Sequence, residues 1–231
     1  MTLFEKFGPY IVINIETIGD PEIPKGLLPV IPDKSTMKAD GRLKDPQKIE
    51  ESLNKVYAEA VHEAAEEIRR FSIYPLTSKI IAFAVAKQVD AQLPSLQVVS
   101  GSEDEILSLI TETFKEAYTI FTYNGKAFDI PHISTAYLRH SGSIPYPHSR
   151  MIQRYNNVHH IDLYEVLSVN GVYKKGTLGD WCERFGIARP FGKGSQVSEW
   201  YEKGDIDSIK HHCSDNVNCT YLLADRIVEM L

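Results

Sequence analysis

The sequence predicts an α/β fold of one domain, and three observations support this prediction. Short apolar runs rich in β-branched residues alternate with longer segments of helical composition, which is typical of a sheet flanked by helices. Hydrophobic residues make up 43% and charged residues 24% of the chain, as in ordinary globular proteins. The length of 231 residues suits one large domain. We therefore expect residues 1–231 to form a single domain with an insertion over about residues 21–76.

The first half of the chain contains a predicted strand, the insertion and two further strands. Tyr10–Ile15 is a β-branched run typical of a buried strand. Asp45-Pro46 indicates a helix start, because Asp is a common capping residue and proline is tolerated at the first helical position. This helix is expected to reach Arg70. The next strands are predicted over residues 79–86 and 96–99.

The second half continues the alternation of helices and strands. A helix over residues 103–117 is followed by a strand over residues 118–123. Another short strand is predicted over residues 158–163. Further helices are predicted over residues 131–140, 178–185, 195–203 and 205–231.

Charge and hydropathy narrow the class of protein. A formal net charge of −6 argues against a protein that coats nucleic acid by bulk electrostatics. The N-terminal residues have no basic region followed by an apolar run, and no apolar stretch reaches the roughly 20 residues that a membrane-spanning helix needs. We therefore expect a cytoplasmic protein with no membrane partner. The three cysteines have no paired spacing, which indicates reduced thiols.

Polar residues gather in three segments at the ends of predicted strands or on a predicted helix. Residues 14–17 read Asn-Ile-Glu-Thr at the end of the first strand, where alternate residues share one face. Residues 124–129 read Asn-Gly-Lys-Ala-Phe-Asp directly after the strand over residues 118–123. Residues 211–216 read His-His-Cys-Ser-Asp-Asn within the C-terminal helix.

In this order the three segments resemble the exonuclease motifs of the DEDD superfamily, in its tyrosine branch. Those motifs read Asp-x-Glu-Thr, Asn-Gly-x-x-Phe-Asp and Tyr-x-x-x-Asp. Nearly the whole chain resembles bacterial proteins akin to the proofreading exonuclease domain of family B DNA polymerases. The resemblance implies an RNase H-like fold, in which a mixed five-stranded sheet is flanked by helices and a helical insertion separates the first two strands.

The resemblance also implies a metal-dependent 3′–5′ exonuclease. Such an enzyme releases nucleoside monophosphates from the 3′ ends of single-stranded DNA, with RNA as an alternative substrate. Two Mg²⁺ or Mn²⁺ ions roughly 3.5–4 Å apart would activate water and neutralise the leaving oxygen. By resemblance, the metal ligands are Asn14, Glu16, Asp129 and Asp215. Glu16 would also orient the attacking water.

Four further residues are expected to contact the nucleic acid. By resemblance, Thr17 contacts the terminal nucleotide, and Asn124 and Phe128 shape the pocket for the last bases. An aromatic face accepts any base, although packing in the core explains Phe128 equally well. Lys193 is a candidate for contact with the backbone, against the alternative of a solvated surface lysine.

Two positions depart from the family pattern. Asn14 stands where the family has the Asp that bridges both ions, and an amide oxygen brings no charge. Losing even a partner outside the ligand shell costs roughly 10–100-fold in metal affinity or activity, so reduced activity is expected. His211, four residues before Asp215, takes the place of the family Tyr. Its imidazole is expected to position or deprotonate water near neutral pH, and a surface histidine is the alternative.

Two hypotheses about function follow. The first is an exonuclease of reduced activity, favoured by Glu16, Asp129 and Asp215. The alternative is a catalytically degenerate homologue that binds nucleic-acid ends or a protein partner, favoured by Asn14. A zinc site around His160 lacks a recognised ligand spacing, and Asp162 is interpreted as a structural acid at a strand end.

Overall fold

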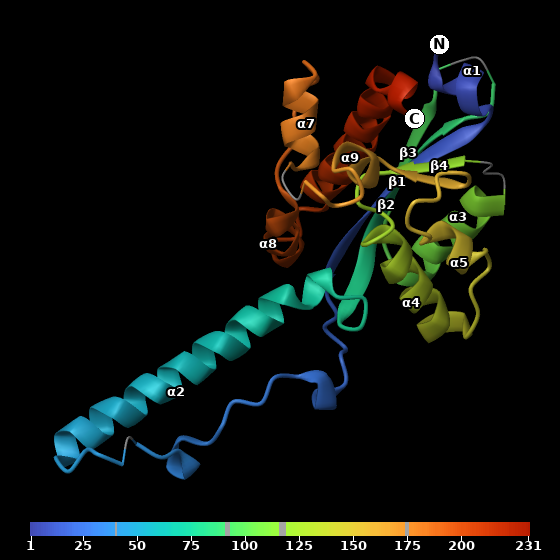
Figure 1. The fold of residues 1–231 in the computed structure, drawn as a ribbon. Coiled ribbons are helices and arrows are strands. Elements are labelled where there is room, and N and C mark those ends of the chain that lie inside the picture. Colours follow the sequence, from blue (N-terminus) through green and yellow to red (C-terminus); the bar gives the residue numbers. More distant parts are fainter. Residues whose placement is uncertain (40, 91–92, 116–118, 174–175) are drawn as a thin grey trace.

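A sheet with the strand order β3-β2-β1-β4-β5 forms the centre of the molecule (Figure 1). The structure, a computed structural model, describes residues 1–39, 41–90, 93–115, 119–173 and 176–231. The strands are β1 (Tyr10–Gly19), β2 (Ser78–Gln88), β3 (Ser95–Ser100), β4 (Thr119–Thr122) and β5 (His160–Asp162). β1 pairs antiparallel with β2 and parallel with β4, which confirms the predicted mixed five-stranded sheet.

Helices cover both faces of this sheet (Figure 1). One face carries α7 (Leu178–Arg184), α8 (Val197–Glu202) and α9 (Ile206–Arg226), and the other carries α3 (Glu103–Lys115), α4 (Asp129–Ser141) and α5 (His148–Met151). Side chains of β1 alternate between two cores, with Val12 packed on the α9 side and Ile13 packed on the side of α3 and α4. Asn14 and Glu16 therefore continue the strand face that α9 covers.

Apart from the long helix described below, the remaining elements are short. They are α1 (Leu3–Phe7), α6 (Leu163–Leu167) and the 3-10 turns η1 (Lys25–Leu27), η2 (Lys34–Thr36), η3 (Arg70–Ile73), η4 (Gly194–Gln196) and η5 (Val228–Met230). The pattern did not predict α5 or α6, and α4 begins two residues earlier than expected, at Asp129. Residues 116–118, where a predicted helix was to pass into a strand, lie outside the described residues.

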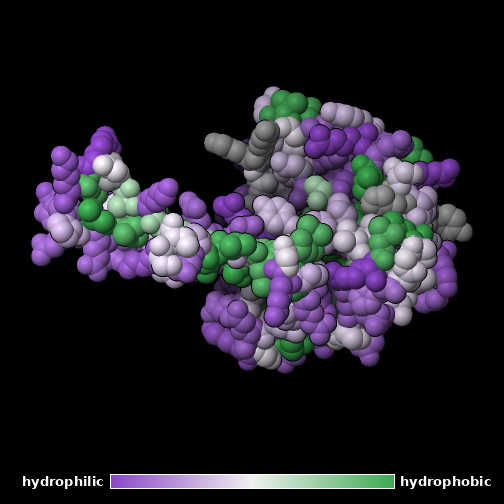
Figure 2. All heavy atoms as spheres, turned by 90° about the horizontal axis from the view of Figure 1, so that it is seen from below, coloured by the Kyte–Doolittle hydropathy of each residue, from purple (hydrophilic) through white to green (hydrophobic). Residues whose placement is uncertain are grey.

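An arm projects from the body between β1 and β2 (Figure 1). It consists of α2 (Pro46–Arg69) and the segment before that helix. The helix begins as predicted, because Asp45 Oδ1 accepts a hydrogen bond from Gln47 N–H at 3.0 Å and Pro46 follows the cap. Apolar side chains continue from the arm onto the body (Figure 2). Within the described ranges, no helix has the length and apolar character needed to cross a membrane.

Candidate functional site

A pocket of about 580 Å³ lies where the end of β1 faces α9. Its walls also come from η3, from the start of α7 and from the loop before η4. A β-bulge between Glu16 and Thr17 shifts the register with β2, and bulges of this kind re-aim side chains next to functional sites. The predicted residues Asn14, Glu16, Thr17, Phe128 and Lys193 all line this pocket.

Glu16 is buried and is held by two amides. Its Oε1 accepts hydrogen bonds from Asn14 Nδ2 at 2.9 Å and from Asn216 Nδ2 at 3.2 Å. Asn14 Nδ2 also donates to Ile15 O at 3.1 Å, so the nitrogen of this amide faces the carboxylate. Burial raises the pKa of Glu16 to about 7, and the hydrogen bonds from the two amides oppose this rise.

His212 completes this cluster from α9. Its Nδ1 donates to Phe191 O, and its Nε2 lies 3.3 Å from Asn216 Nδ2 and 3.6 Å from Glu16 Oε1. Burial lowers the pKa of His212, so the neutral ring accepts from Asn216 through Nε2. His212 and Asn216 are one helical turn apart and point the same way.

The structure does not bring Asp215 and His211 to Glu16, which corrects the expectation that they share this site. Asp215 Oδ2 accepts a hydrogen bond from Phe191 N–H at 2.9 Å and lies 3.9 Å from His211 Nε2. The ring of His211 stacks on that of Phe191. One step along a helix turns a side chain by about 100°. His211 and Asp215 therefore point away from Glu16, whereas His212 and Asn216 point toward it.

Asp129 approaches the end of β1 from the first residue of α4. Its buried Oδ1 accepts a hydrogen bond from Ile15 N–H at 2.9 Å. Burial raises the pKa of Asp129 to about 8, the Ile15 hydrogen bond opposes the rise, and the charges of Asp162 and Glu16 add to it. The preceding residue, Phe128, lines the pocket and also packs on the core beneath α4. Its position is therefore compatible with contact to a base and with packing in the core.

The other predicted contact residues lie around the same end of the sheet. Thr17 Oγ1 donates to Ser72 O at 2.5 Å, which fastens β1 to η3. Asn124 lines a neighbouring pocket of about 440 Å³ that shares Asn14 and Asn216 with the first. Lys193 is exposed at the wall of the larger pocket.

The donor set does not fit a pair of divalent cations. Glu16 and Asp129 offer carboxylates, whereas Asn14 and Asn216 direct N–H groups at Glu16. Mg²⁺ and Mn²⁺ prefer oxygen ligands, and N–H donors beside the carboxylate oppose a cation there. Among the residues that the structure describes, no group of three or more His, Cys, Asp or Glu side chains is placed to hold a metal ion.

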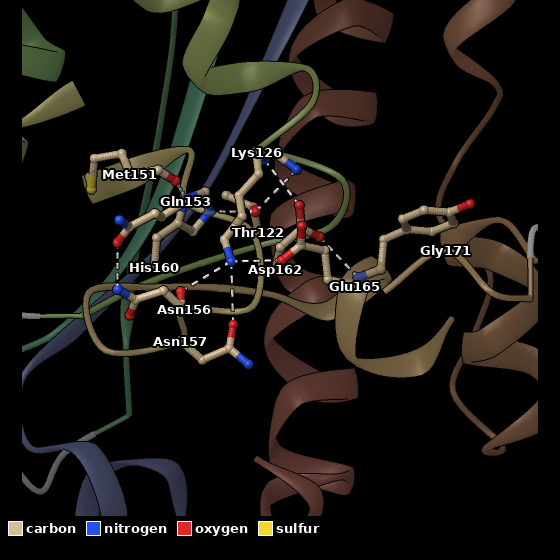
Figure 3. Close-up of polar contacts among 12 residues, drawn as sticks. Thr122, Lys126, Met151, Gln153, Asn156, Asn157, His160, Asp162, Glu165 and Gly171 are labelled. Atoms are coloured by element: carbon tan, nitrogen blue, oxygen red, sulfur yellow. Dashed lines mark hydrogen bonds and ion pairs between the residues drawn. The ribbon is translucent and has the colours of Figure 1, made fainter. Parts of the chain in front are cut away.

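A buried polar cluster fixes the loop between β4 and α4 (Figure 3). Asp162 accepts hydrogen bonds from the backbone N–H groups of Asn124 at 2.7 Å and Lys126 at 3.0 Å, and it caps α6 through Tyr164 N–H. This confirms its interpretation as a structural acid. Lys126 Nζ pairs with Glu165 Oε2 at 2.7 Å and donates to Asn156 O at 3.2 Å.

Gly125 lets this loop pass close to β4. A Cβ atom at Gly125 would lie 2.4 Å from the side chain of Thr122, which is too close for any other residue. Thr122 Oγ1 accepts from Gly125 N–H at 3.1 Å and hydrogen-bonds His160 Nε2 at 2.7 Å. His160 Nδ1 in turn donates to Met151 O at 2.7 Å (Figure 3).

His160 makes the stability of the fold depend on pH. Burial lowers its pKa to about 4, against about 6.5 in the unfolded chain. Between these values the unfolded state binds a proton that the folded state does not, so the contribution of His160 falls as pH falls from about 6.5 to 4, by about 3 kcal/mol. Urea unfolding of wild type and His160→Gln at several pH values should show this difference. Equal pH dependence in the two proteins would contradict it.

The chain is similar to known proteins in its sequence and in its fold. Residues 70–230 match the family described as "Predicted 3'-5' exonuclease related to the exonuclease domain of PolB". No curated protein matches the chain. The fold is similar to that of the family B DNA polymerase from the hyperthermophilic archaeon Pyrobaculum calidifontis, with a TM-score of 0.57 and 15% sequence identity. That match covers 95% of this chain and 24% of the polymerase chain.

Proposed function

Because this chain belongs to the family of predicted 3′–5′ exonucleases related to the exonuclease domain of PolB, we propose that it binds the 3′ end of single-stranded DNA or RNA without efficient hydrolysis. The observation that carries this proposal is the pairing of Glu16 with two amides, those of Asn14 and Asn216. Of the two hypotheses from the sequence, the geometry therefore favours the degenerate homologue.

The positions of His212 and Asn216 in the third motif segment support this proposal. Asn216 and His212 are four residues apart and both face Glu16, as the acid and the tyrosine of the family motif are expected to do. Asp215, one residue earlier, binds Phe191 N–H instead. If Asn216 holds the acidic position of the third motif, two of the four acidic positions of the family carry amides, at Asn14 and Asn216. Two such replacements lower the affinity for a cation more than the replacement at Asn14 alone.

The pocket retains features that suit a strand end. Lys193 supplies an exposed cation for a phosphate, and Phe128 supplies an aromatic face for a base. Arg189 also lines the pocket, but it pairs with Asp180 at 3.0 Å and Glu183 at 2.6 Å. The raised pKa of Glu16 lowers the negative charge that a phosphate would meet near neutral pH.

Slow hydrolysis assisted by Mn²⁺ is the second candidate function. The observation that favours it is that Asp129 accepts a hydrogen bond from Ile15 N–H, beside Glu16 in β1, and that the charge of Glu16 reaches Asp129 and helps to raise its pKa. These residues would hold one cation at most weakly, because Asp129 already accepts a hydrogen bond from Ile15 N–H and Glu16 is bonded to two amides. The binding and the length of a labelled strand distinguish binding without hydrolysis from slow hydrolysis.

We expect the protein to bind a 5′-labelled single strand equally well in EDTA and in Mn²⁺, and to leave the strand at full length. Fluorescence anisotropy measures the binding, and a denaturing gel measures the length. A circular strand of the same sequence should bind more weakly, because it has no 3′ end to enter the pocket. Lys193→Ala should lower the slope of log K against log salt by about 0.7, as expected for one lost phosphate contact with a single strand.

Lys115→Ala serves as the matched control for Lys193→Ala. Lys115 is an exposed lysine on α3, on the opposite side of the sheet, and it pairs with Glu112 at 2.8 Å. This variant should bind the strand like wild type. Failure of the wild-type protein to bind linear strands at low salt would overturn the proposal, and stepwise shortening in Mn²⁺ would favour the second candidate.

A further inference from the structure

Three aromatic rings form a parallel stack beside the pocket. The ring of Phe191 lies 4.4 Å from that of His211, with 8° between their planes. It lies 5.6 Å from the ring of Trp200, with 13° between the planes. The three residues come from the loop before η4, from α8 and from α9, so the chain assembles the stack from separate elements.

The backbone of Phe191 is fixed to α9 at both of its polar atoms. Phe191 N–H donates to Asp215 Oδ2 at 2.9 Å, and Phe191 O accepts from His212 Nδ1. Gly192 then allows Trp200 to approach, since a Cβ atom at this position would lie 2.4 Å from the Trp200 ring. The orientation of the stack is therefore set before any ligand binds.

The stack adjoins the pocket and is open to solvent at one end. Pro190 and Gly192, on either side of Phe191, line the pocket, as does His212 next to His211. The side chain of His211 is 60% exposed, and Phe191 is 38% exposed. At the other end, Trp200 is partly buried and meets the ring of His212 edge-on at 5.7 Å.

From this arrangement we infer that His211 ends a stacking platform for a nucleobase of the bound strand, a few nucleotides before its 3′ end. The inference rests on the proposed binding of a strand end in the pocket. A strand that leaves the pocket past Pro190 and Gly192 meets the exposed ring of His211, and a base adds to the existing stack. Every base has a flat face, so the platform accepts any sequence.

This role differs from the catalytic role that the sequence suggested for His211. The imidazole contributes its face, whereas a general base would need to reach a water at Glu16, which the direction of the side chain prevents. Asp215 acts through Phe191 N–H and His211, so it is a positioning residue for the platform.

The test uses single strands that carry 2-aminopurine at successive positions, because stacking quenches the fluorescence of this base. Binding to wild type should quench one position near the 3′ end. His211→Ala should abolish that quenching and weaken binding about tenfold, the usual effect of losing one stacked base. His211→Phe should restore both, because it keeps the flat face without the imidazole nitrogens. His62→Ala, which removes an exposed histidine from the arm, is the matched control and should behave like wild type.

The outcomes separate this inference from the proposed function. If wild type binds strands and His211→Ala binds them with the same affinity and the same quenching, the platform is overturned while end binding stands. If His211→Phe fails to restore what His211→Ala loses, the imidazole nitrogens matter and stacking is overturned. If wild type binds no strand, the proposed function fails first.

Discussion

The double variant Asn14→Asp/Asn216→Asp is expected to gain a divalent-cation site that neither single variant has. In wild type, both amides donate N–H groups to Glu16. Replacing both with carboxylates removes two donors from this position and adds two oxygen ligands, which is the chemistry that Mg²⁺ and Mn²⁺ prefer. Without a cation the added charges repel Glu16, so the double variant should be less stable than wild type.

Thermal unfolding with and without Mn²⁺ measures this gain. Mn²⁺ should raise the melting temperature of the double variant, by the equivalent of about 2.7 kcal/mol at a concentration 100 times the Kd. Wild type and both single variants should shift little. The same four proteins, incubated with a 5′-labelled strand, should show stepwise shortening by the double variant alone.

Asp215 provides the opposing test. If Asp215 were a ligand, Asn14→Asp alone would bind Mn²⁺, and adding Asp215→Ala would abolish that binding. If Asn216 holds the position, Asp215→Ala in the double variant leaves Mn²⁺ binding intact. Gain of Mn²⁺ binding by Asn14→Asp alone would therefore contradict the assignment of Asn216.

Lys126→Met is expected to destabilise the fold by about 3 kcal/mol, at the lower end of the range for breaking a buried ion pair. The side chains of Lys126 and Glu165 are 3% and 12% exposed, and their charged atoms lie 2.7 Å apart. Removing the ammonium leaves the Glu165 carboxylate buried without its cation. Urea unfolding at pH 7 measures the loss as a lower midpoint at an unchanged m-value.

A double-mutant cycle shows whether the cost comes from the unpaired carboxylate. Lys126→Met/Glu165→Met should be more stable than Lys126→Met, because replacing both members of a buried pair by apolar residues is often close to neutral. Lys115→Met is the matched control, since Lys115 and Glu112 form a pair of similar length, at 2.8 Å, that is exposed. Its loss should be too small to resolve.

The mixed sheet, the longer helices on its faces and the helical arm were predictable from the sequence. Strand β1 carries the clearest signal, because alternate side chains enter two separate cores and the β-branched run is long. The start of α2 was also predictable, since Asp45 supplies the capping side chain and Pro46 suits the first helical position. The short helices α5 and α6 were missed because four or five residues give no periodic pattern.

The first two motif segments lie beside each other at the end of β1, where Asp129 bonds Ile15 N–H, and the third reaches Glu16 through Asn216, one residue after Asp215. The motif spacing of four fits both His211 with Asp215 and His212 with Asn216, and the presence of an acid favoured the first pair. Helical periodicity could have decided between them. The buried stripe of α9 runs through Ile209, Cys213, Val217, Thr220 and Leu223, and Asn216 lies beside it while Asp215 lies across the helix.

The arm leaves the sheet and returns to it at a single pair of residues, Gly19 and Ser78, which are already partners in the β1–β2 ladder. In topological terms it is one long hairpin loop, so its length has little effect on the entropy of closing the two strands. The segment from residue 70 to β2 does not share this tolerance of length. Ser72 O accepts a hydrogen bond from the Thr17 hydroxyl, and Ile73 lines the pocket. The arm between Asp20, which binds Thr77 O and Arg139, and the buried Ala64 is therefore the segment that we expect can be shortened or exchanged while the sheet and the pocket keep their architecture.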